Sequence, residues 1–249
     1  MSNEKLKLVE IDKFPREFTL VNGLPDVGLV GAIAASYMVK NLKMWLAGYL
    51  DSDLMPPVLV FHDEKPMMPV RLYAGESIVV LVSEVAIPPD LMPELAKVVI
   101  EWASGKGVKR VVTLGGIPVP NRIDIEKPLV VAAAILEEDR KFLKDLRLEV
   151  LKEGFLSGMY ALMAKECMRR NIPCITLLAQ SHLNYPDPGA AASVLEALSK
   201  MLGFPVDVKP LLDEEEEIRL KLRELMKRTM SAVRAAPKGY EHTPPLMYA

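Results

Sequence analysis

The stretch FTLVNGLPDVGLVGAIAASYMVKNL, residues 18–42, decides the fold. Its apolar, β-branched start at residues 18–21 predicts a strand, and the amphipathic residues 29–42 predict a helix. Between them, Gly23, Gly28 and Gly31 form a glycine-rich turn, where bare backbone amides could hold an anion at the helix N-terminus. A strand that passes through a short turn into a helix is typical of the units from which α/β domains are built.

The same alternation continues along the chain and sets the fold class. Strands that are apolar on both faces, separated by helices of ten or more residues, favour a parallel sheet covered on both sides. The sequence therefore predicts a three-layer α/β/α fold with a largely parallel central sheet. The expected strands are 78–82, 110–114, 129–136 and 174–179, and the expected helices are 91–102, 156–170 and 189–202.

Residues 42–75 follow another pattern. Three short apolar runs, at 44–50, 58–61 and 70–73, are separated by prolines and contain no helical spacing. We expect strands and hairpins here, which extend the sheet with antiparallel strands.

The sequence predicts one domain of residues 1–210, followed by a C-terminal helix and a tail. Residues 211–236 begin with the acidic run DEEEE (213–217) and end with basic residues, an order that suits the dipole of a helix. The single apolar stripe of this helix must be buried, either against the chain's own body or against the same helix in other copies. Residues 237–249 are rich in proline, glycine and polar residues and predict a flexible, extended tail.

Composition excludes several classes of protein. A net charge of −2 removes the general attraction that nucleic-acid binders have for their ligand, and no apolar run approaches the roughly 18 residues of a membrane span. Cys167 and Cys174 are spaced for neither a zinc site nor a disulfide framework, so a reducing cytoplasm is expected. The mean hydropathy of +0.17 and the 14 methionines suggest that some apolar surface faces another subunit.

Candidate site residues lie at the predicted strand-to-helix junctions, where parallel sheets usually bind ligands. A pocket there could place a base beside an orienting acid. The alternatives are that the glycines serve close packing and that Asp187 caps a helix. The glycine turn has neither the dinucleotide fingerprint nor the lysine of a P-loop, and the three histidines share no metal-binding spacing, so we expect no cofactor, metal or catalytic residue. The ligand-loop candidates are Gly23, Gly28, Gly31, Gly115, Gly116, Glu153 and His182.

Five segments taken together resemble the PAC2 family of proteasome assembly chaperones, in its archaeal form. They are LVNGLPDVGLVG (20–31), VTLGG (112–116), EGFLSG (153–158), NIPC (171–174) and YPDPGAA (185–191). The resemblance implies a nucleoside phosphorylase-like α/β/α fold and a homo-oligomer, with a pentamer as one candidate stoichiometry. It also implies that the protein is not an enzyme.

In this family, docking on the α-ring of the proteasome core particle uses a C-terminal motif of a hydrophobic residue, a tyrosine and any residue. Met247, Tyr248 and Ala249 match this motif position by position. The resemblance thus implies that the Ala249 carboxylate pairs with a lysine between α subunits, while Tyr248 fills the mouth of the pocket. The leading hypothesis is a cytoplasmic assembly chaperone or adaptor of the proteasome. The alternative is a phosphorylase-like enzyme or small-ligand-binding protein that uses the glycine-rich loops.

Overall fold

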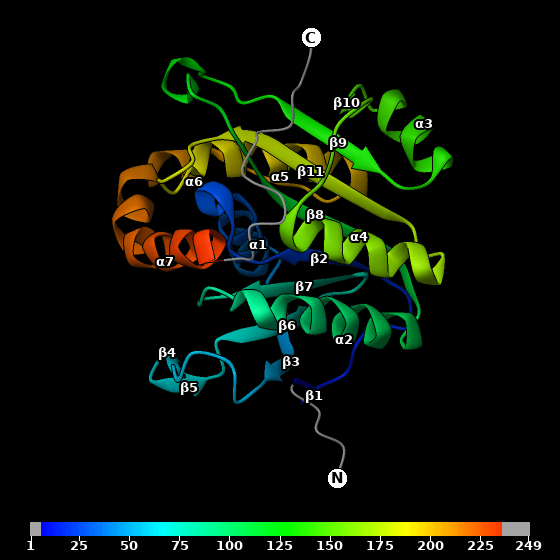
Figure 1. Cartoon of the computed structure of the whole chain (residues 1–249), viewed down its shortest axis with the longest axis vertical. Helices are drawn as coiled ribbons and strands as arrows, with labels where there is room; N and C mark the ends of the chain where they lie inside the picture. The colour runs from blue at the N-terminus through cyan, green and yellow to red at the C-terminus, as the bar shows by residue number, and fades with distance from the viewer. Residues whose placement is uncertain (1–5, 236–249) are drawn as a thin grey trace.

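The computed structural model describes residues 6–235 and contains a nine-stranded sheet with helices on both faces (Figure 1). The strand order is β1-β3-β6-β7-β2-β8-β11-β9-β10. The strands of this sheet are β1 (Lys7–Glu10), β2 (Phe18–Gly23), β3 (Trp45–Asp51), β6 (Val70–Ala74), β7 (Ile78–Ser83), β8 (Val108–Pro118), β9 (Val130–Ala134), β10 (Glu149–Val150) and β11 (Cys174–Ser181).

The four central strands, β7, β2, β8 and β11, run parallel. Val21 of β2, for example, lies opposite Val80 on one side and Val112 on the other. One apolar layer joins the sheet to α1 (Val30–Asn41) and α5 (Pro188–Leu202), and a second joins it to α2 (Met92–Gly105) and α4 (Gly158–Arg170). The predicted three-layer α/β/α arrangement is confirmed.

Antiparallel pairing is more extensive than the prediction of a largely parallel sheet implied, because four of the eight neighbouring strand pairs are antiparallel. On one side, β1, β3 and β6 form the antiparallel extension expected from residues 42–75. On the other side, β9 runs against β11. Residues 119–129 between β8 and β9 form only a loop with one short turn, which is too little chain for the helical crossover that a parallel strand needs.

Several shorter elements complete the fold. A separate hairpin of β4 and β5 stands beside the main sheet (Figure 1), and α3 packs near β9 and β10 at the other end. These elements are β4 (Val60–His62), β5 (Lys65–Met67), α3 (Glu137–Asp145), and the 3-10 turns η1 (Val27–Leu29), η2 (Pro89–Leu91) and η3 (Arg122–Asp124).

The predicted C-terminal helix is present as a short α6 (Lys209–Asp213) followed by α7 (Glu215–Ala235). Its apolar stripe, including Leu222, Met226 and Met230, joins the same core as α1 and α5. The stripe is therefore buried against the chain's own body. No helix in the described part of the chain is long and apolar enough to span a membrane.

Candidate functional site

The parallel strands β2, β8 and β11 end at one edge of the sheet, the carboxyl edge, where open α/β sheets usually bind ligands. The structure brings the glycine turn, the double glycine after Leu114 and the start of the loop at His182 together here. A methyl group on Gly116 would lie 2.7 Å from the Val27 carbonyl oxygen and 2.9 Å from Ser181 Cβ. Glu153 is not part of this group of contacts. It is exposed in the loop before α4 and makes no hydrogen bond or ion pair with another described residue.

The glycines of the turn allow the backbone to pack directly on neighbouring strands. Gly28 has a positive φ of 63°, and a Cβ on it would lie 1.9 Å from the Ser181 hydroxyl oxygen. A Cβ on Gly31 would lie 2.3 Å from the Leu114 carbonyl oxygen, and one on Gly23 would lie 2.1 Å from the Ala35 methyl. Such distances leave no room for any side chain, so close packing alone accounts for these three residues.

Asp26 and Tyr160 meet at Gly115 without forming a hydrogen bond. A methyl group on Gly115 would lie 1.7 Å from the Tyr160 hydroxyl and 2.7 Å from Asp26 Oδ2. Both carboxylate oxygens of Asp26 and the Tyr160 hydroxyl are buried, and none has a hydrogen-bond partner within residues 6–235, although other atoms of both residues reach the surface. Burial raises the pKa of the Asp26 carboxyl well above its ordinary value. The backbone N–H groups of Gly116 and Val27 lie near the carboxyl without the geometry of a full hydrogen bond, and they offset this rise only in part.

Sequence reasoning missed both residues. Asp26 precedes η1 and looks like a helix cap, yet its side chain caps nothing. Tyr160 lies within the predicted helix of residues 156–170, where its spacing indicates no more than a place on one helix face. The one sequence signal was an acidic residue inside an otherwise apolar, glycine-rich turn.

Asp187 holds the loop after β11 to the loop after β8. Its carboxylate accepts two hydrogen bonds from Arg122, each of 2.8 Å, and both side chains are buried. The same carboxylate accepts a hydrogen bond of 2.9 Å from the Ala190 N–H, so the prediction that Asp187 caps a helix, α5, is confirmed. Its ion pair with Arg122 was not predicted, because the two residues are 65 positions apart.

His182 lies next to this ion pair. Its backbone N–H donates to Asp187 Oδ2 at 3.0 Å. Burial lowers the pKa of its imidazole, the Asp187 carboxylate offsets part of this, and the positive charges of Arg122 and Arg219 lower it further. The ring is therefore neutral at pH 7. No group of three or more potential metal ligands of the His, Cys, Asp and Glu types gathers anywhere in residues 6–235.

A sequence model of the PAC2 family matches residues 20–226, which is most of the chain. The chain belongs to the PAC2 family. The family and fold that the five sequence segments suggested are therefore confirmed.

Archaeal proteins are among the relatives of this PAC2 protein. Uncharacterized protein MJ0106 of Methanocaldococcus jannaschii is 30% identical over 240 residues, covering 95% of this chain and 98% of that protein. The crystal structure of Pyrococcus furiosus PbaA, an archaeal homolog of proteasome-assembly chaperone, matches with 33% identity and a TM-score of 0.86, covering 92% of this chain and all of that one. Pyrococcus furiosus PbaB, an archaeal proteasome activator, shares the fold at 22% identity, with a TM-score of 0.74 and coverage of 89% and 99%.

In this PAC2 protein, α7 lies along the carboxyl edge. It contacts η1 after β2 and η2 after β7, and charges near its start, on Glu215 and Arg219, act on His182. Met226 and Thr229 of α7 are almost completely buried. A helix of the chain itself thus covers the ends of β2 and β7 at the edge where α/β enzymes bind their substrates. The motif Met247, Tyr248 and Ala249, and His242 of the tail, lie outside the described residues.

Replacing Asp26 with asparagine should stabilise the protein at alkaline pH. The folded state holds the Asp26 proton more tightly than the unfolded state, so this carboxyl favours folding at low pH, and the contribution is lost as the pH rises through the raised pKa. Asparagine keeps the shape and carries no charge. We expect the free energy of unfolding of Asp26→Asn at pH 9 to exceed that of the wild type by about 1 to 3 kcal/mol, the cost of a buried polar group without a partner. At acid pH the free energies of unfolding of the variant and the wild type should become equal.

Urea denaturation at a series of pH values measures this difference. Asp139 is the matched control, because it is also buried but accepts a hydrogen bond of 2.5 Å from Arg110. Asp139→Asn should therefore destabilise the protein where Asp26→Asn stabilises it. A loss of stability in Asp26→Asn that is equal at every pH would mean that the native carboxylate has a stabilising partner.

Proposed function

We propose that this PAC2 protein is a proteasome assembly chaperone or adaptor, and that it binds the α-ring of the core particle as a homo-oligomer through its C-terminal tail. The observation that carries the proposal is the match to PbaA, a proteasome-assembly chaperone homolog, over nearly the whole of both chains. The match of Met247, Tyr248 and Ala249 to the docking motif supports the tail as the contact. A role in binding also agrees with the position of α7 over the carboxyl edge.

The chemistry of the tail suits a pocket that recognises a chain end. A free carboxylate exists only at the C-terminus, and a lysine with backbone donors can select it. Tyr248 would add a large, rigid contact, and Met247 an adaptable apolar one. One tail contributes little affinity, so several tails on one oligomer would raise the effective concentration of each further tail at the ring.

The test is binding of purified archaeal α-rings to the full-length protein. Tyr248→Ala should weaken binding at least 30-fold, about 2 kcal/mol, as expected for a central aromatic contact. Tyr240 lies in the same tail outside the motif, so Tyr240→Ala is the matched control and should bind as the wild type does. Equal affinities for the two variants would rule out the tail mechanism.

The carboxylate itself is tested by adding one glycine after Ala249. This extension keeps every side chain and moves the terminal charge by one residue. We expect it to weaken α-ring binding as strongly as Tyr248→Ala, while the size of the oligomer stays the same. Unchanged binding of the extended protein would mean that the terminal carboxylate is not recognised.

The second candidate function is a small-ligand-binding protein or enzyme, favoured by the unpaired Asp26 and Tyr160 at the strand ends. A ligand that hydrogen-bonds to these groups should raise the melting temperature. Thermal shift against a panel of nucleosides and phosphates measures this, with Glu153→Gln, His182→Ala and Asp26→Asn as variants. If no compound of the panel raised the melting temperature of the wild type, this would count against the second function.

A further inference from the structure

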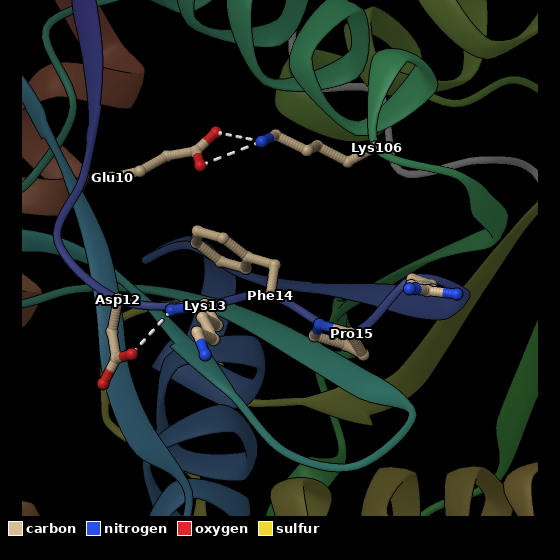
Figure 2. A pocket seen from close by; sticks show the side chains of 7 residues that line it. Glu10, Asp12, Lys13, Phe14, Pro15 and Lys106 are labelled. Carbon is tan, nitrogen blue, oxygen red and sulfur yellow. Dashed lines mark hydrogen bonds and ion pairs between the residues drawn. The ribbon is translucent and has the colours of Figure 1, made fainter.

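A hollow of about 490 Å³ lies at the opposite edge of the sheet, where β2 and β8 begin. It is formed by the segment between β1 and β2 and by the residue that follows α2. Figure 2 shows the side chains of Glu10 and Lys106 pointing toward each other. The Phe14 ring lies between this pair and the backbone of the segment that runs from Asp12 to Pro15. The hollow is therefore lined by an aromatic side chain and by charged side chains of both signs.

The positive charges of this hollow are only partly compensated. Lys106 pairs with Glu10 at 2.9 Å, and Asp12 accepts a hydrogen bond from the backbone N–H of Lys13. The ammonium group of Lys13 and the guanidinium of Arg16 have no hydrogen bond or ion pair with another described residue, and both side chains are exposed. Three cations, Lys13, Arg16 and Lys106, line the hollow against the two carboxylates of Glu10 and Asp12, so its lining has a net charge of +1. A net positive charge beside an aromatic ring suits a partner that carries carboxylates and an apolar side chain.

The β4–β5 hairpin presents that combination. Asp63 and Glu64 form its tip, are exposed and make no ion pair within the described chain. Lys65 follows them and is also exposed and unpaired, so these three residues carry a net charge of −1. Next to them Phe61 is 63% exposed, although large aromatic side chains are usually buried. The hairpin is fixed to the body by His62, whose Nε2 lies 2.7 Å from Glu84 Oε1, while Glu84 also pairs with the buried Arg71.

The backbone of the tip is strained. Asp63 has a φ of 47° and Glu64 a φ of 64°, a pair of positive values that favours asparagine and glycine at a two-residue hairpin turn. This conformation is unfavourable for a glutamate, because its Cβ lies close to the following carbonyl oxygen. Strain that is kept in a fold often marks a site where the side chain is needed. A glycine at position 64 would relieve this strain, but it would also remove the Glu64 carboxylate.

The hairpin and the hollow cannot meet within one chain. The hairpin leaves the sheet after β3 and is tied to the carboxyl end of β7, whereas the hollow lies at the amino ends of β2 and β8. A strand of six residues separates the two edges by about 20 Å. Figure 1 shows the hairpin and the end of α2 on opposite sides of the molecule.

We propose that the tip of the β4–β5 hairpin of one copy docks into the hollow of a second copy, with Asp63 and Glu64 facing Lys13 and Arg16 and with Phe61 packed near Phe14. Because the two surfaces differ, the contact is head-to-tail, and repeating it gives a closed ring when the rotation between copies permits closure. Such a ring would gather the tails on which the proposed function depends.

Charge reversal tests the contact by sedimentation velocity of the full-length protein, with no proteasome present. Reversing the tip with Asp63→Lys and Glu64→Lys, or the hollow with Lys13→Glu and Arg16→Glu, should raise the dissociation constant of the oligomer at least tenfold. The chain with all four substitutions should regain the oligomer, because the charges are again complementary. A monomeric wild type, unchanged assembly of the double variants, or failure of the fourfold variant to recover would overturn the proposal.

Two further variants separate docking from folding. Lys144→Glu with Lys165→Glu changes the net charge as much as the reversed hollow does, at exposed positions on α3 and α4, and should leave the oligomer intact. Glu64→Gly should raise the melting temperature by relieving the strain and still weaken the oligomer; an intact oligomer in this variant would contradict a role for the Glu64 carboxylate. Because the size is measured without α-rings, a tail that fails to bind them leaves this result unaffected.

Discussion

Arg122→Ala is expected to lower the free energy of unfolding by about 3 to 5 kcal/mol, the usual cost of leaving one partner of a buried ion pair alone. Asp187 is completely buried, and both hydrogen bonds from Arg122 would be lost. The Ala190 and His182 N–H groups that remain cannot neutralise the carboxylate. The loops after β8 and β11 would then lose the contact that holds them together.

Urea denaturation at pH 7 measures this loss, and an exposed ion pair supplies the control. Lys109 lies 2.6 Å from Glu17, but both side chains are exposed. Lys109→Ala should therefore cost no more than about 1 kcal/mol. If Arg122→Ala were as mild as Lys109→Ala, the buried pair would not contribute to stability in the way its geometry suggests.

A double variant then shows whether the effect comes from the unpaired charge. Arg122→Met with Asp187→Asn removes both charges, and the asparagine can still cap α5. We expect this pair to be more stable than Arg122→Ala alone, because no uncompensated charge stays buried. A double variant less stable than the single one would indicate that shape, and not charge, dominates at this position.

The second large effect is expected from Gly31→Ala, which should lower stability by about 3 kcal/mol and the melting temperature by roughly 6 to 12 °C. The new methyl group would lie 2.3 Å from the Leu114 carbonyl oxygen, which is a backbone atom and cannot rotate away. The first turn of α1 would have to move away from β8. This displacement would also shift the neighbouring turn that contains Asp26 and Gly28.

Differential scanning calorimetry of two variants checks this prediction. Gly105 ends α2, and a methyl group there would meet no atom within 4 Å. Gly105→Ala should keep or slightly raise the melting temperature, because alanine favours helix more than glycine does. Equal melting temperatures for the two alanine variants would show that α1 can move without cost.

Much of the candidate site could be predicted from local patterns. The glycine turn, the double glycine at 115–116, and the cap at Asp187 are each encoded within a few residues, and they all fall at the carboxyl edge. Asp26 and Tyr160 could not be found in this way. Their importance lies in the absence of partners, which depends on strands and helices that are distant in the sequence.

The direction of the outer strands also could not be predicted from local sequence patterns. An apolar run at 129–136 predicts a strand equally well whether its neighbour is parallel or antiparallel, and only its pairing with β11 settles the direction. The sequence also left open what the C-terminal helix packs against, because an apolar stripe is the same whether it faces its own body or another copy. The contact of α7 with α5, and the apolar core that both share with α1, decide this.

The amino-acid sequence by itself determined the α/β class, the succession of central strands and helices, the glycine turn, the PAC2 resemblance and the motif at the C-terminus. These depend on periodicity and on short-range spacing, which operate within a few residues. Only the tertiary structure decided which charges are paired, which polar groups are buried without partners, and which edges carry the hairpin and the hollow. Burial and ion pairing depend on distances in space, and the number of residues between two positions in the sequence does not determine these distances.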